Sequence, residues 1–257
     1  MELPSAAWGE YIDALRIINN KAAELMRKFL ETHSIPKTKA EMDALIDYAF
    51  KVSTKYGEAA ATAAAEMYDA IAKGSGRTIG GPYRAAFPAA TPDYHEVAKA
   101  VVGTAKTENP GIISDAVSRL VKRTGVDTTM QNAIRDGAEW AWIPVGDTCA
   151  FCLMLASNGW QRASKAALAG GHAEHIHANC DCTYAVRFDR KSGVQGYDPD
   201  KYKKMYDEAD GSNWHQKLNS MRRDIYDENA EEINEQKRDA YEKRKERESS
   251  AAEELDV

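Results

Sequence analysis

Four cysteines and one histidine are spaced like the ligands of a metal site. The first pair is Cys149 and Cys152, and the second group contains His177, Cys180 and Cys182. The chain has 257 residues and no other cysteine. Thiolates and imidazoles are the ligands that tetrahedral Zn2+ prefers in proteins, and a C-x2-C pair commonly supplies half of such a site. The spacing therefore predicts bound zinc.

Five candidate ligands are available for four tetrahedral positions. Cys149, Cys152 and Cys182 are the surest, and His177 and Cys180 compete for the fourth place. In an extended segment Cys180 and Cys182 point to the same face, so both could reach the metal. A catalytic zinc keeps one position for water, whereas a structural zinc has four protein ligands. The surplus of ligands therefore predicts a closed, structural Zn2+ whose binding energy adds to the folding energy.

Other interpretations of the cluster stay open. Reduced cysteines can serve as small buried hydrophobes. A zinc-dependent enzyme, such as a nuclease, hydrolase or deaminase, would use His172, Glu174 or His175 beside the metal. The H-x-E of a zinc deaminase precedes its C-x-x-C, whereas here the cysteines come first, so we predict no enzymatic activity. A nucleic-acid-binding zinc module is a further alternative, although the net charge of -6 argues against unassisted binding to duplex DNA.

Apolar residues recur at helical spacing through most of the chain, so we predict a mainly α fold. The first helix is expected at residues 5–33. Thr38 lies three residues before Glu41, which is a capping-box arrangement, so a second helix should begin there. This helix should continue through an alanine-rich stretch, because alanine has the highest helix propensity. Glycine and proline then predict a loop or linker at about 74–92.

Shorter elements are expected after this loop. Further helices are predicted at residues 93–104, 111–124 and 128–142. Trp140 and Trp142 precede the cysteines, and we expect them to pack the metal module against the helices. Alternate residues from Cys180 to Phe188 share one parity, which predicts the short β element of that module.

The predicted elements divide the chain into three parts. A helical domain is expected at 1–143, a Cys/His zinc-binding module at 144–190 and a charged helical extension at 191–257. Residues 212–248 of the extension have the composition of one long, charged helix with few apolar positions. Such a helix buries little of itself, so we expect it to need a partner or to fray.

The cysteine cluster and its flanks resemble a known family signature. Residues 146–155 read GDTCAFCLML and residues 177–183 read HANCDCT. This order is similar to that of the tailed-phage minor head proteins, the phage Mu F-like head-morphogenesis family. Its members carry D-x-T-C-x-x-C-x-x-L and then H-x-x-C-x-C followed by a strand. The likeness covers residues 146–188.

The resemblance implies a minor capsid protein present in few copies. Its expected partners are the phage portal protein, the major capsid protein or both, with scaffold protein a further candidate, and some such proteins lie near DNA inside the head. The expected location is the virion, in the capsid interior or the portal region, after assembly in the host cytoplasm. No membrane partner is expected, because no run of apolar residues approaches the ~20 that a bilayer requires.

Overall fold

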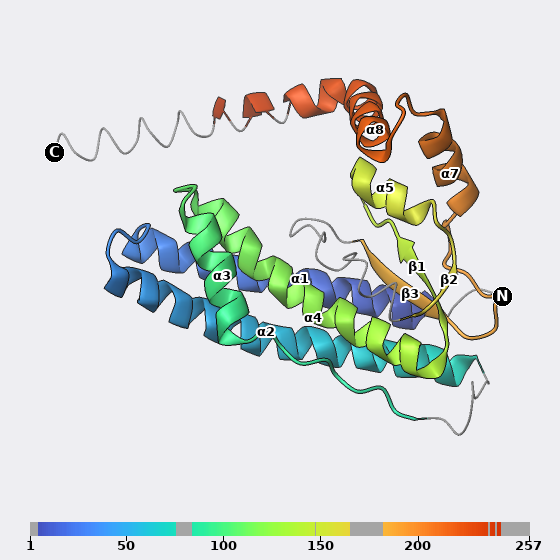
Figure 1. Cartoon of the computed structure of the whole chain (residues 1–257), viewed down its shortest axis with the longest axis horizontal. Coiled ribbons are helices and arrows are strands. Elements are labelled where there is room, and N and C mark those ends of the chain that lie inside the picture. Colours follow the sequence, from blue (N-terminus) through green and yellow to red (C-terminus); the bar gives the residue numbers. More distant parts are fainter. Residues whose placement is uncertain are drawn as a thin grey trace.

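Three long helices lie side by side and form a bundle (Figure 1). They are α1 (Ser5–His33), α2 (Lys39–Gly74) and α4 (Pro110–Asp136). The structure is a computed structural model, and it describes residues 5–75, 84–146, 148–164, 182–235, 237–239 and 241–242. Over these residues the protein is mainly helical, which confirms the predicted fold class.

The first two helices begin and pack as their sequences predict. One face of α1 is buried in the core through Trp8, Tyr11, Leu15, Ala22 and Met26. The capping box before α2 is present. The backbone N–H of Glu41 donates to Thr38 Oγ1 at 3.2 Å, and Glu41 Oε2 accepts from the Thr38 N–H at 3.0 Å. These bonds satisfy N–H groups that would otherwise have no partner at the start of a helix.

The central helix α4 is continuous, so the predicted break at Thr124 and Gly125 is wrong. Glycine and threonine have low helix propensity, but here both residues are buried inside the bundle, and the helix continues through them. The Thr124 hydroxyl donates back to the Leu120 carbonyl at 3.1 Å, which satisfies it without ending the helix. Gly125 lies so close to α2 that a Cβ atom would be 3.2 Å from the Ala60 carbonyl oxygen. Gly125 therefore permits close helix packing.

The helix predicted to reach Trp142 ends earlier, at Asp136, and a strand follows. Gly137 adopts a left-handed φ of 65° and caps α4. Strand β1 (Glu139–Ile143) then lies between β2 (Gln161–Arg162) and β3 (Thr183–Arg187) in an antiparallel sheet of order β2-β1-β3. The strand predicted within 180–188 is thus confirmed as β3. Its partner β1 belongs to the segment assigned to the helical domain, and the division into three domains stays a prediction.

An extended segment, residues 84–93, runs along α4 and leads into α3 (Tyr94–Ala105); we call it the strap. It contains neither helix nor strand, as predicted for this part of the loop. Its backbone groups are bonded by side chains of α4. Asn132 accepts from the Phe87 N–H at 3.1 Å and donates to the Phe87 carbonyl at 2.8 Å, and Thr128 Oγ1 accepts from the Ala89 N–H at 2.9 Å.

Three shorter helices follow the first strand along the chain and lie together beside the sheet (Figure 1). They are α5 (Ala150–Ala156), α7 (Pro199–Glu208) and α8 (Trp214–Glu228). The single helix predicted for 212–248 is interrupted at Asn229, whose side-chain amide donates to the Ile225 carbonyl at 2.8 Å, and residues 230–235 are helical again. None of the described helices combines the length and apolar character needed to span a bilayer.

Candidate metal centre

Cys149 and Cys152 lie at the start of α5. Cys149 is the residue before the helix, with an extended backbone (φ -71°, ψ 156°), and its carbonyl accepts the first helical hydrogen bond, from Leu153 at 3.1 Å. Cys152 lies within the first turn and is 1% exposed, whereas Cys149 is partly exposed. A short connection from β1 leads into this pair, so the sheet positions both cysteines.

Cys182 lies immediately before β3 and is fully buried. The Val145 N–H donates to its Sγ at 3.4 Å, and Thr148 Oγ1 lies 3.8 Å from the same sulfur. Val145 and Thr148 belong to the connection between β1 and α5. The fold therefore brings Cys182 beside the segment that ends at Cys149, although 32 residues separate the two cysteines in the sequence.

The surroundings of Cys182 suit a thiolate that binds a metal. A backbone N–H directed at sulfur stabilises the deprotonated form, which is the form that ligates zinc. Tyr202 of α7 lies near enough to interact electrostatically with Cys182. Burial is the main cause of the raised pKa of Tyr202, and negative charge at Asp198 and Cys182 adds to it. The Tyr202 ring also lies 6.1 Å from that of Tyr197.

The two tryptophans of β1 anchor this region to the bundle, as predicted. Trp140 and Trp142 are both buried, and each ring meets Tyr184 of β3 edge-on, at 4.6 Å and 4.9 Å between centroids. The link to α2 runs through Phe188, whose ring lies 5.3 Å from that of Tyr68. The sheet is therefore part of the main hydrophobic core and a firm support for the cysteines.

The structure places three of the five predicted ligands. His177 and Cys180 lie outside the described residues, as do His172, Glu174 and His175, so the fourth ligand stays a prediction. Within the described part of the chain, no three or more His, Cys, Asp or Glu side chains form a group that could hold a metal. Cys149, Cys152 and Cys182 therefore do not form such a group by themselves, and the zinc site stays a prediction.

Sequence reasoning did not find the groups that contact Cys182. Thr148 stands in the D-x-T-C segment, which supports the family resemblance but was not used to predict a contact. The Val145 group that contacts the sulfur is a backbone N–H, which cannot be recognised from the type of the residue. Tyr202 is 20 positions beyond Cys182, and nothing in the spacing connects the two.

Comparison with known proteins gives one family. A model of the VG15 protein family matches residues 2–209. The matched range contains the bundle, the sheet, α5, α7 and all five predicted metal ligands, and it ends before α8. Neither the curated proteins nor the solved structures gave a significant match.

Proposed function

Because the chain belongs to the VG15 protein family, a family of phage gene products, we propose that it is a minor capsid protein of a tailed phage. The match over residues 2–209 is the observation that carries this proposal. This match shows that the chain is a phage protein, but it does not show that the chain belongs to the phage Mu F-like family that the cysteine motif resembles. The minor capsid role and the association with portal or major capsid protein come from that resemblance.

Our proposal for the metal is one structural Zn2+. Cys149, Cys152 and Cys182 would bind it, with His177 or Cys180 as the fourth ligand. The buried Cys182 beside the connection that carries Val145 and Thr148 supports this assignment. Zinc would there cross-link the β1–α5 connection to the start of β3 and contribute folding energy. In this proposal the protein has no catalytic activity, and metal-dependent turnover by the purified chain would contradict it.

The capsid role is tested on purified particles of the phage that encodes the chain. Quantitative mass spectrometry should find it in mature heads at a small fraction of the copy number of the major capsid protein. Deletion of its gene should reduce the yield of infectious particles. A protein that is missing from mature heads and whose deletion leaves head assembly and infectivity intact is not a minor capsid component.

The zinc site is tested by replacing Cys182 with serine in the full chain. Elemental analysis should find one zinc per chain in the wild type and substantially less in Cys182→Ser. The free energy of unfolding should fall by about 3–5 kcal/mol, the range of large losses such as loss of a metal. Thr183→Ser is the matched control, because this buried neighbour loses one methyl group and should keep the zinc. Full zinc content in Cys182→Ser would overturn our choice of ligand.

A further inference from the structure

The side chain of Lys217, near the start of α8, bonds to the end of another helix. Its Nζ donates to three backbone carbonyls, those of Tyr206 at 3.0 Å, Asp207 at 2.9 Å and Ala209 at 3.0 Å. An ammonium group has three N–H donors and no acceptor, so these bonds use all of its donors. The Tyr206 ring adds a cation–π contact, with its centroid 5.3 Å from the same nitrogen. The three carbonyls thus form a site that fits one primary ammonium ion.

The carboxyl end of α7 lacks a cap of its own. The last turn of this helix has no basic residue, and its acidic residues Asp207 and Glu208 pair with lysines one turn earlier. The end of a helix carries partial negative charge, and its last carbonyls have no partner within the helix. Ala209 follows with an extended backbone (φ -66°, ψ 134°) in place of the left-handed glycine that often caps a helix. Lys217 therefore supplies from α8 the cation and the donors that α7 needs.

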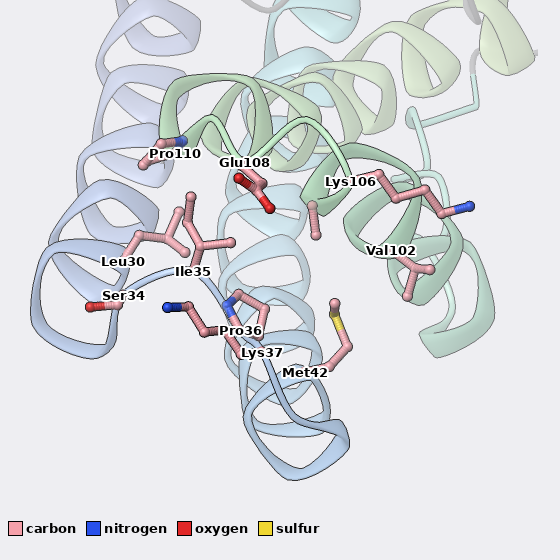
Figure 2. A pocket seen from close by; sticks show the side chains of 11 residues that line it. Leu30, Ser34, Ile35, Pro36, Lys37, Met42, Val102, Lys106, Glu108 and Pro110 are labelled. Atoms are coloured by element: carbon pink, nitrogen blue, oxygen red, sulfur yellow. The ribbon is translucent and has the colours of Figure 1, made fainter.

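A second lysine at a helix end provides a contrast. Lys106 follows α3 and lines a cavity of about 650 Å³ where α1 turns into α2 and α3 turns into α4. Figure 2 shows its ammonium pointing away from that cavity. Lys217 is partly buried instead, and its ammonium is directed at another helix. Fixing a lysine side chain costs conformational entropy, so the bonds of Lys217 must outweigh that cost.

The bonds of Lys217 lie at the place where α8 is attached to the rest of the chain. The next residue, Leu218, packs in one buried cluster with apolar side chains of α5 and α7. The Ser220 hydroxyl accepts from the Asp210 N–H at 3.2 Å, which is a further link to the turn after α7. The second half of α8 is mostly exposed. The attachment of α8 is therefore concentrated in its first turns, around Lys217.

We propose that Lys217 is a latch, whose ammonium fills a site for a primary ammonium ion at the end of α7 and thereby keeps α8 closed against α7 and α5. Without the ammonium these carbonyls need water as a partner, and separation of α8 from α7 admits it. The bundle and the sheet are not part of the latch and stay folded when it opens. This inference depends neither on the metal nor on the proposed function.

The latch is tested by hydrogen exchange in the full chain at the amides of residues 219–225. Lys217→Met keeps an unbranched apolar side chain without the ammonium, and Lys217→Ala removes the side chain beyond Cβ. Both variants should exchange at least about tenfold faster than the wild type in α8, because hydrogen bonds from charged groups are stronger than neutral ones. Exchange in α2 and α4 should stay slow. Unchanged exchange in α8 of Lys217→Met would show that packing holds the helix, and faster exchange throughout the bundle would show that the opening is not local; either result overturns the proposal.

The matched control is Lys204→Ala. Lys204 is an exposed lysine of α7 whose ammonium lies 3.8 Å from the Glu208 carboxylate. This variant removes the same charge beside the same helix end without touching the three carbonyls, so exchange in α8 should match the wild type. An acceleration equal to that of Lys217→Ala would show a general charge effect and contradict the latch.

Chemical rescue separates the ammonium site from simple packing. Lys217→Ala lacks the atoms of n-propylammonium, so this ion can take the place of the missing side chain. At about 100 mM, a concentration suited to so small a ligand, it should restore slow exchange in α8 of this variant. n-Propanol has the size without the charge, and tetramethylammonium has the charge without an N–H donor, so neither should restore it at the same ionic strength. Equal effects of the three compounds, or no rescue by n-propylammonium, would overturn the assignment of the site.

Discussion

Asp127 is a partly buried carboxylate on α4 whose ionisation depends on the fold. Burial is the main cause of the rise of its pKa from 3.8 to about 6, while the charge of Arg123 opposes the rise and that of Glu96 adds to it. Arg123 is shared between two acids, because its guanidinium lies 2.9 Å from Glu96 and 3.8 Å from Asp127. The more distant Asp127 is the less well compensated of the two.

This raised pKa predicts that the free energy of unfolding falls as the pH rises. A carboxyl group with a higher pKa in the folded state favours folding while it is protonated, and this contribution is lost as pH rises from about 4 through about 6. Asp127→Asn should therefore raise the free energy of unfolding at pH 7.5 by about 1–2 kcal/mol and have little effect at pH 4. Urea unfolding at the two pH values measures this difference. Asp43→Asn, at an exposed site on α2, should show no such gain, and an equal gain in both variants would refute the explanation.

The cysteine site shows what residue types can reveal. The pattern of Cys149, Cys152 and Cys182 identified a candidate site, and the structure brings Cys182 to the segment before Cys149. The electrostatic interaction between Cys182 and Tyr202 depends on how α7 returns to the sheet, which is a tertiary property. Residue spacing records which ligands are near in sequence, but it does not record which distant side chains cover them.

Among the elements, helix α4 is the one that is more buried than its polar residues would predict. It is covered by α1, α2, α3 and the sheet, and the buried hydroxyls of Ser114, Thr124 and Thr128 donate to carbonyls of the preceding turn. Local patterns predicted a break because glycine and threonine favour other conformations in isolation. Strand β1 was likewise predicted as helix, since its partner β3 lies some 40 residues further along the chain. In contrast, α1 and α2 could be predicted from periodicity and a capping box, which are local signals.

The packing of α4 predicts opposite effects for the same substitution at two helical glycines. Gly125→Ala should lower the free energy of unfolding by about 1–3 kcal/mol, because the added Cβ meets the Ala60 backbone carbonyl at 3.2 Å. Gly103→Ala, on an exposed part of α3 with nothing within 4 Å, should raise it by about 0.5 kcal/mol through helix propensity. Chemical denaturation of both variants checks the pair. A stabilising Gly125→Ala would show that α2 and α4 are not closely packed there.

At the scale of the whole molecule the described residues form two hydrophobic clusters. The larger contains the bundle and the sheet, and the smaller joins α5 to α7 and α8. Helix α5 belongs to both, because Cys152 and Leu155 face the larger cluster while Ala150 and Leu153 face the smaller. The charged helix that we expected to need a partner thus finds one within the chain, in its first turns. Sequence composition predicted the need for a partner but not its identity.

This division predicts that α8 can be released while the bundle stays folded. Leu218→Ala removes a side chain of the smaller cluster that is 3% exposed, and it should cost about 2–4 kcal/mol locally. Hydrogen exchange should then speed up in α8 and remain slow in α2 and α4. Leu45→Ala, at a site on α2 that is 1% exposed, is the matched control and should destabilise the bundle itself. Faster exchange throughout the bundle in Leu218→Ala would show that the two clusters unfold together.

The antiparallel register of β1 and β3 also decides how the protein bears a mechanical load. Glu139 lies opposite Arg187, so the strand ends that lead to the bundle and to α7 are at the same end of the ladder. A pull on the C-terminal helices against the bundle therefore unzips the ladder from that end, one hydrogen bond at a time. That end of the ladder carries an ion pair between Arg187 Nη2 and Glu139 Oε2, at 2.8 Å, with Arg190 Nε 3.6 Å from Glu139 Oε1. The ion pairs of Glu139 with its two arginines thus hold the two strands together at the end of the ladder where unzipping begins.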